Sequence, residues 1–262
     1  MRIAALQGPP VTEGAPEALA RLEDAAARAG AAGAALLVTP EMFLSGYAIG
    51  PERIRAAAEP ADGPSWAGAA ALAAQHGIAI VVGGPLLADG AVYNAARAYG
   101  PTGLLSAYEK AQLFGEVDRS QFSPGARTGV VFEHAGWVIG LGICYDIEFP
   151  EFARRLAHAG AEIAAIPTAN MKPFTTVCTR LVPARSEENG LAIAYANYAG
   201  PEGPFDYCGL SVITGPDGED LARASAEGEA LLLADLDRQA VLETRRRVPY
   251  LADIRHDLYD LR

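Results

Sequence analysis

The sequence has few cysteines and few lysines, and each shortage is informative. Three dispersed cysteines in 262 residues, Cys144, Cys178 and Cys208, make no disulfide framework. We therefore expect a reducing compartment, the cytoplasm. Of 21 basic residues only Lys110 and Lys172 are lysines. A chain this rich in arginine keeps a lysine by chance or where a compact ammonium serves better than a planar guanidinium, so both lysines are worth examining.

Long apolar runs and excess positive charge are missing too. No apolar run approaches the ~18 residues of a membrane span, and the N-terminus has no signal-peptide layout, so we expect no membrane partner. The formal net charge is −11, which argues against a nucleic-acid partner because such a partner needs a basic surface. The four histidines are scattered, and no Cys/His pair has ligand spacing. We therefore expect no metal.

Hydrophobic patterning predicts alternating strands and helices around a sizeable core. The early β-α-β units imply parallel pairing, whereas later hairpins imply antiparallel pairing. About nine to eleven strands exceed what one open sheet holds comfortably, so we predict two packed sheets flanked by helices in a single domain, residues 1–262. The charged stretch from about 238 to 262 is expected to be an arm, and residues 111–125 to be irregular. The strands are expected at 2–7, 34–39, 78–83, 92–98, 104–110, 137–143, 162–168, 191–197, 209–214 and 230–236, and the main helices at 16–29, 65–76, 150–159 and 175–189.

Three residues with chemical potential each stand at the end of an apolar strand. Glu41 follows the second strand, Lys110 ends the fifth, and Cys144 follows the strand 137–143. Ligands of α/β sheets bind at the carboxyl ends of strands, so neighbouring strands would bring these groups into one crevice. Taken singly, each has an ordinary structural interpretation, because Cys is often a small buried hydrophobe and surface charges are common. Together they indicate nucleophilic catalysis.

The three groups suit acyl transfer. A partly desolvated Glu41 would take the thiol proton of Cys144, and the thiolate would attack a carbonyl or nitrile carbon. The ammonium of Lys110 and the N–H of Tyr145 would hold the developing oxyanion. Glu41 would then activate a water against the thioester.

Two other hypotheses remain open at this point. A papain-like Cys–His hydrolase would need a histidine beside Cys144, and the candidates are His134, His158 and His256. In a non-catalytic assembly module, Cys144 would only contribute to packing. An inert thiol and no turnover would favour the module.

The segments around the three residues resemble the motifs of the nitrilase superfamily of carbon–nitrogen hydrolases. They read P-E-M-F-L-S-G-Y, Y-E-K-A-Q-L-F-G and G-I-C-Y-D-I-E-F-P-E. The resemblance implies an α-β-β-α sandwich, catalytic Glu41, Lys110 and Cys144, no metal or organic cofactor, and homodimers or larger homo-oligomers with exchanged C-terminal arms. Many members also carry a second Glu between the Lys and Cys motifs. Here Asp118 stands at the aligned position, with Glu116 as its rival.

Within that family, hydrolysis of a small primary amide to an acid and ammonia is the first expectation. The same triad could cleave an N-carbamoyl amino acid, the ω-amide of a 2-oxo acid, or a nitrile. A carboxylate-bearing substrate would need a cation in the pocket. Lys172 is a candidate, and the alternative is that Lys172 is an ordinary surface lysine. The remaining substrate-binding candidates are Tyr47, Tyr145 and Asn170. Phe149 and Phe174 could line the pocket with Tyr47 and Tyr145, or these aromatic residues could simply belong to the core.

Overall fold

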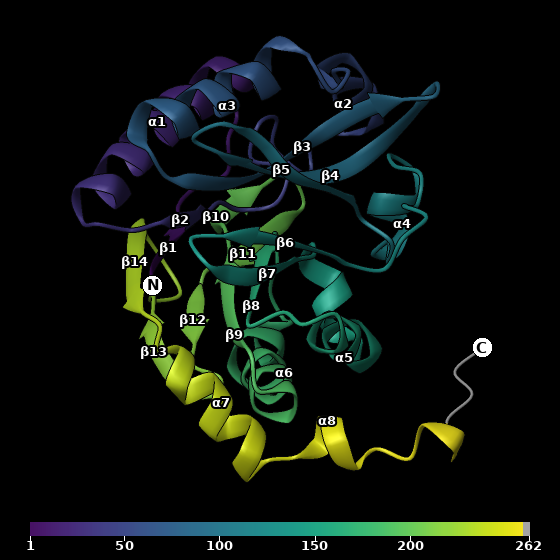
Figure 1. Ribbon diagram of the computed structural model, residues 1–262. Coiled ribbons are helices and arrows are strands. Elements are labelled where there is room, and N and C mark those ends of the chain that lie inside the picture. Colours follow the sequence, from purple (N-terminus) through teal and green to yellow (C-terminus); the bar gives the residue numbers. More distant parts are fainter. Residues whose placement is uncertain (259–262) are drawn as a thin grey trace.

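The structure, a computed structural model, describes residues 1–258. Two six-stranded mixed sheets pack face to face, and helices cover their outer faces (Figure 1). The predicted α-β-β-α sandwich is confirmed. The first sheet has the order β14-β1-β2-β3-β4-β5 and contains β1 (Arg2–Gln7), β2 (Leu36–Val38), β3 (Ala79–Ala88), β4 (Ala91–Gly100), β5 (Gly103–Glu109) and β14 (Ala230–Asp235). The second has the order β13-β12-β9-β8-β7-β6 and contains β6 (Val130–His134), β7 (Trp137–Leu141), β8 (Ile163–Pro167), β9 (Ala192–Ala196), β12 (Val212–Thr214) and β13 (Asp220–Arg223).

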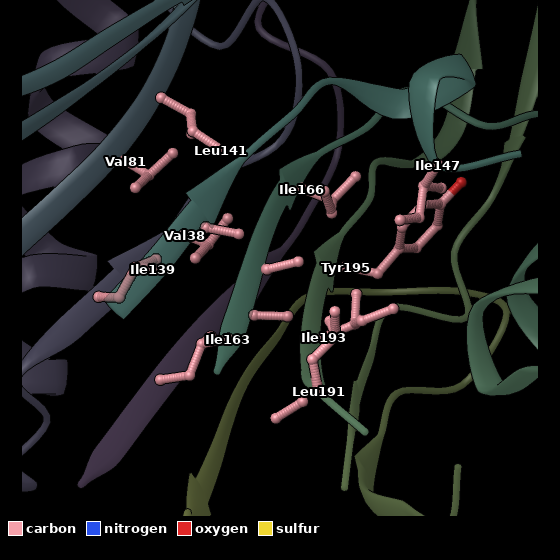
Figure 2. Close-up of a cluster of buried hydrophobic side chains, with 14 of the residues drawn as sticks. Val38, Val81, Ile139, Leu141, Ile147, Ile163, Ile166, Leu191, Ile193 and Tyr195 are labelled. Atoms are coloured by element: carbon pink, nitrogen blue, oxygen red, sulfur yellow. The ribbon is translucent and has the colours of Figure 1, made fainter. Parts of the chain in front are cut away.

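Apolar side chains fill the space between the sheets and also the space under the outer helices, because side chains alternate along each strand. On β1, Ile3 and Ala5 belong to the layer between the sheets, whereas Ala4 and Leu6 face the helices outside. Figure 2 shows Val38 and Val81 of the first sheet beside side chains of the second sheet, such as Ile139. Both faces of each sheet are therefore buried, which explains why the strands read as near-continuous apolar runs.

Helices α1 (Ala15–Ala31) and α3 (Pro64–His76) cover the first sheet, and α5 (Pro150–His158) and α6 (Val182–Asn189) lie by the second (Figure 1). On α5, Phe152 and Leu156 are buried and pack over two glycines that flank the end of β7, Gly140 and Gly142. A Cβ at Gly142 would collide with the ring of Phe152. Glycine at this position therefore lets α5 pack closely against the segment that leads to Cys144.

Fourteen strands occur in residues 1–258, against nine to eleven predicted. The four that sequence patterning missed are short: β6, β13 and the separate hairpin of β10 (Ala199–Glu202) and β11 (Phe205–Cys208). The expected irregular segment 111–125 contains a five-residue helix, α4 (Gly115–Arg119), which is too short to show a helical period. Strand β14 returns to the first sheet, where it pairs antiparallel with β1.

The C-terminal stretch expected to be an arm begins as a helix packed on the body. Helix α7 (Arg238–Arg247) buries Val241, and the guanidinium of Arg245 donates to the carbonyl oxygen of Gly190 at 3.0 Å. Helix α8 (Tyr250–Asp253) contacts α5 and α6. Residues 259–262, the end of the predicted arm, lie outside the described residues. Within residues 1–258, no helix is both long and apolar enough to cross a bilayer.

Candidate active site

Cys144 opens a 3₁₀ turn, Cys144–Glu148, that links β7 to α5. Its backbone has a φ of 46°, a left-handed conformation that costs a residue with a Cβ of order 1–3 kcal/mol. Such strain persists only where the surrounding structure enforces it. The turn projects Cys144 out of the buried strand, and its side chain lines a cavity.

Glu41 lies in the turn that follows β2, and its N–H donates to the carbonyl oxygen of Thr168, just after β8, at 3.1 Å. This bond joins the ends of strands from the two sheets. The turn passes so close to β3 that a Cβ at Gly83 would be 2.6 Å from the nitrogen of Met42. The missing side chain of Gly83 therefore leaves room for the loop that carries Glu41. The side chain of Glu41 is fully buried.

Lys110, the residue after β5, forms two buried ion pairs. Its Nζ donates to Oε1 of Glu41 at 2.8 Å and to Oδ2 of Asp118 at 2.7 Å. All three side chains are inaccessible to solvent. An ammonium has three N–H donors, and in the described residues these two carboxylates are its only hydrogen-bond acceptors. One donor is therefore available to a ligand.

Asp118, on α4, holds three donors. Its Oδ2 accepts from Lys110 and from the N–H of Phe114 at 2.8 Å, and its Oδ1 accepts from the Tyr47 hydroxyl at 2.7 Å. Glu116, two residues earlier, is exposed. Helix α4 thus turns one acid toward Lys110 and the other to solvent.

The two oxygens of Glu41 have different surroundings. Oε1 accepts from Lys110 and from Nδ2 of Asn94 at 2.7 Å. Oε2 is buried and, in the described part of the chain, accepts no hydrogen bond. A buried carboxylate oxygen without a partner is rare in folded proteins, where buried polar atoms are nearly always hydrogen-bonded.

Charge and burial set the protonation states of the three groups. Burial raises the pKa of Glu41 above its usual value, although the positive charge of Lys110 opposes that shift. Burial also opposes the charge on Lys110, but the carboxylates of Asp118 and Glu41 outweigh it and hold the pKa of Lys110 well above its usual value. Burial and the Glu41 charge together raise the pKa of the Cys144 thiol. The resting sulfur is therefore a thiol, which needs a base before it can attack.

A buried carboxylate, Asp146, ties the cysteine turn to the lysine loop. It accepts from the N–H of Gln112 at 3.0 Å, from the N–H of Ile143 at 3.1 Å and from the Tyr108 hydroxyl at 2.9 Å. Burial raises its pKa to about 6. Because Gln112 and Ile143 stand near Lys110 and Cys144 along the chain, this side chain sets the spacing between the two loops.

The cavity at Cys144 has a volume of about 190 Å³, below the usual range for drug-sized ligands. Aromatic rings make up much of its wall, and Phe114 meets both Tyr145 and Phe174 edge to face. Such a pocket suits a small, partly apolar molecule. The residues that line it are Tyr47, Phe114, Cys144, Tyr145, Glu148, Ala169, Asn170, Met171 and Phe174.

The structure brings most of the sequence-predicted site residues together. Tyr47, Tyr145 and Asn170 line the cavity with Cys144, whereas Lys172 does not: it is half-exposed and pairs with Asp206 at 2.7 Å. Phe149 stacks edge to face on Tyr145 behind the wall.

Sequence reasoning missed Asn94 and Glu148. A polar residue in the apolar strand 92–98 was the available signal for Asn94.

Of the histidines named by the papain-like hypothesis, His134 and His158 are not in the cavity wall. The ring of His134 lies 3.0 Å from the carbonyl oxygen of Ala35, and His158 ends α5. The side chain of His256 lies outside what the structure describes. Over residues 1–258, no three or more His, Cys, Asp or Glu side chains are grouped as metal ligands would be.

Comparison with known proteins identifies relatives along nearly the whole chain. The family model described as carbon-nitrogen hydrolase matches residues 2–246. A Pseudomonas protegens protein named "hydrolase in pqqF 5′ region" is 47% identical over 262 residues, which cover 99% of this chain and 91% of that protein. An (R)-stereoselective amidase of a Pseudomonas species is 35% identical over 222 residues, covering 84% and 79%.

A solved amidase from Nesterenkonia sp. AN1 has the same fold. It is 34% identical, superposes with a TM-score of 0.84, and the match covers 98% of both chains. One mutant of that amidase carries acrylamide joined to the active-site cysteine by Michael addition, and another was solved with butyramide. From the family match and these relatives we conclude that the chain belongs to the carbon–nitrogen hydrolase family of the nitrilase superfamily, enzymes that hydrolyse non-peptide carbon–nitrogen bonds.

Proposed function

We propose that this protein is an amidase that hydrolyses small primary amides to a carboxylic acid and ammonia through a thioester on Cys144. The observation that carries the proposal is the asymmetry of Glu41. Lys110 and Asn94 hold one of its oxygens, while the other is buried without a hydrogen-bond partner in residues 1–258. A buried carboxylate oxygen left free in this way suits a general base.

In the first half-reaction, Glu41 Oε2 takes the thiol proton and the sulfur of Cys144 attacks the amide carbon. The carbonyl oxygen becomes an oxyanion, which the unused N–H of Lys110 and the N–H of Tyr145 stabilise. Backbone N–H groups of a first helical turn have no partner within the helix, and Tyr145 is the second residue of its turn. Losing one such donor typically costs ~3–4 kcal/mol of barrier.

The intermediate then collapses as the C–N bond breaks. Glu41 returns the proton to the departing nitrogen, which leaves as ammonia, and the acyl group remains on the sulfur as a thioester. In the second half-reaction Glu41 takes a proton from water, the hydroxide attacks the thioester carbon, and the C–S bond breaks. The thiolate regains its proton from Glu41, so the enzyme returns to its starting state.

The relatives support an amide over the other substrates of such a triad, since the Nesterenkonia amidase was solved with butyramide and a Pseudomonas relative is named an amidase. Other relatives include an omega-amidase from Xenopus tropicalis. A screen of ammonia release across simple amides, carbamoyl amino acids and nitriles would therefore rank the substrate classes directly. We expect the simple amides to lead.

The test of the mechanism uses matched cysteine variants. Cys144→Ala should abolish ammonia release from butyramide, and iodoacetamide should modify Cys144 in step with loss of activity. Cys208→Ala is the control, because it removes a thiol that is buried outside the cavity. An inert Cys144 and no turnover of any amide would instead favour the assembly module. Turnover that survives Cys144→Ala would rule out the thioester.

The homodimer or larger homo-oligomer and the cytoplasmic location expected from the sequence stay proposals. Light scattering of the purified protein would measure the assembly state, and fractionation of the producing cells would locate it.

A further inference from the structure

One carboxylate in the cavity wall has no part in the proposed reaction. Glu148, the last residue of the 3₁₀ turn, is half-buried and lines the cavity beside Cys144 and Tyr145. Its backbone carbonyl accepts from Arg185. In residues 1–258 its carboxylate has no hydrogen bond or ion pair, and the positive charges of Lys110 and Arg185 act on it only at longer range. It is the only charged side chain among the residues that form the wall.

The nearest cations are committed elsewhere. Lys110 already pairs with two buried carboxylates, those of Glu41 and Asp118. Arg185 donates to the backbone carbonyls of Ile147 at 3.2 Å and Glu148 at 2.8 Å, and its remaining nitrogen pairs with Glu188 at 3.1 Å. The surroundings of the cavity therefore hold more negative than positive charge.

The rest of the wall also favours a cation over an anion. The rings of Tyr47, Phe114, Tyr145 and Phe174 line the cavity. An aromatic face attracts an ammonium group through the ring quadrupole, and aromatic rings combined with a carboxylate form sites for amines. An anion would find no basic side chain in this wall, because Lys172 pairs with Asp206 outside it.

We propose that Glu148 determines acyl-group specificity: it makes the enzyme prefer amides whose acyl group carries a protonated amine and disfavour those whose acyl group carries a carboxylate. The inference rests on the proposed amidase function and names its substrate class. It predicts a lower kcat/KM for the carboxylate-bearing ω-amides and carbamoyl amino acids than for neutral and amino-substituted amides.

The test compares three amides with the same two-methylene spacer. β-Alaninamide ends in an ammonium group, butyramide in a methyl group and succinamate in a carboxylate. For the wild-type protein we expect kcat/KM to fall in that order, with succinamate at least tenfold below butyramide. Glu148→Gln keeps the shape of the side chain and removes its charge. It should lower kcat/KM for β-alaninamide about tenfold and raise it for succinamate about tenfold, each step corresponding to about 1.4 kcal/mol.

Two controls separate charge at the pocket from other effects. The kcat/KM of Glu148→Gln for the uncharged butyramide measures how far the substitution disturbs the site in general, so the values for β-alaninamide and succinamate are compared relative to it. Glu151→Gln removes the same charge at an exposed position three residues along the chain and should leave the order of the three amides unchanged.

The outcomes distinguish the two proposals. If the wild-type protein hydrolyses none of the three amides, the proposed amidase function fails. If butyramide is hydrolysed but succinamate is used as well as β-alaninamide, or if Glu148→Gln leaves their ratio unchanged, only the role of Glu148 is overturned.

Discussion

Replacing Asp118 by asparagine should separate the charge of this residue from its hydrogen bonds. The amide oxygen can occupy the place of Oδ2 and accept from Lys110 and the Phe114 N–H. The amide nitrogen then faces the Tyr47 hydroxyl, which can reverse from donor to acceptor. The contacts survive, and one negative charge is lost beside Lys110 and Glu41.

The magnitude follows from the strength of hydrogen bonds to charged groups. Hydrogen bonds to charged groups contribute about 1.5–3 kcal/mol. In Asp118→Asn only Lys110 keeps its charge, so the bond moves from the upper to the lower part of that range and Lys110 is held about 1–2 kcal/mol less firmly. If that difference is expressed in the transition state, kcat/KM for butyramide falls about 5- to 30-fold. The same loss should lower the melting temperature by roughly 2–8 °C.

The same variant shifts the pH dependence in a defined direction. The negative charge of Asp118 raises the pKa of Glu41, because like charges disfavour ionisation. Removing that charge lowers the pKa of Glu41, so the acidic limb of the kcat/KM profile should move to lower pH. Ammonia release from butyramide across a pH series measures both effects.

Asp118→Ala is the contrasting variant. It leaves the Tyr47 hydroxyl and the Phe114 N–H without their acceptor and Lys110 with one carboxylate, which should lower the free energy of unfolding by about 3–5 kcal/mol. Full activity in both variants, or an acidic limb that moves to higher pH in Asp118→Asn, would refute this account of the site.

Three further predictions concern packing and pH. In Gly142→Ala the new methyl group should collide with Phe152, lower the free energy of unfolding by about 1–3 kcal/mol and lower kcat by displacing the cysteine turn. Urea unfolding and turnover measure the two effects, and a wild-type unfolding free energy together with a wild-type kcat would contradict the prediction. Burial raises the pKa of Asp146 to about 6, so the folded state holds this proton more tightly than the unfolded chain. The resulting stabilisation, about 3 kcal/mol in all, is fully present below the usual Asp pKa and is lost as pH rises to 6. In Asp146→Asn the free energy of unfolding should therefore depend less on pH between pH 4 and 7. The same pH dependence as in the wild type would count against this prediction. Val241→Asp puts a carboxylate where the side chain is 1% exposed and should free α7 to limited proteolysis, whereas a resistant helix would show that other contacts hold it.

Local patterns in the sequence were enough to predict most of the fold. Strands β1, β3 and β7 lie in mostly apolar segments bounded by turn residues, and such segments can be recognised without tertiary context. The short elements β6, β10, β11 and α4 were not predicted, because a few residues carry too little periodic signal and their pairing depends on distant partners. The two-sheet sandwich followed from strand number, and the structure confirms it.

The candidate site, too, has features that the sequence predicts and features that only the folded structure sets. The sequence by itself determined that Glu41, Lys110 and Cys144 stand at strand ends, because that depends only on the run preceding each residue. It could not decide between Asp118 and Glu116, since that choice rests on which side of the short helix α4 faces the buried lysine. Asn94 and Glu148 likewise acquire their positions only when separate strands and turns meet.

What only the tertiary structure decided is therefore the pairing of charges. Lys110 pairs with two carboxylates, and Lys172 pairs outside the cavity. The physical reason is that burial and distance, which set the strength of a charge interaction and the protonation state of each group, exist only after the two sheets have packed.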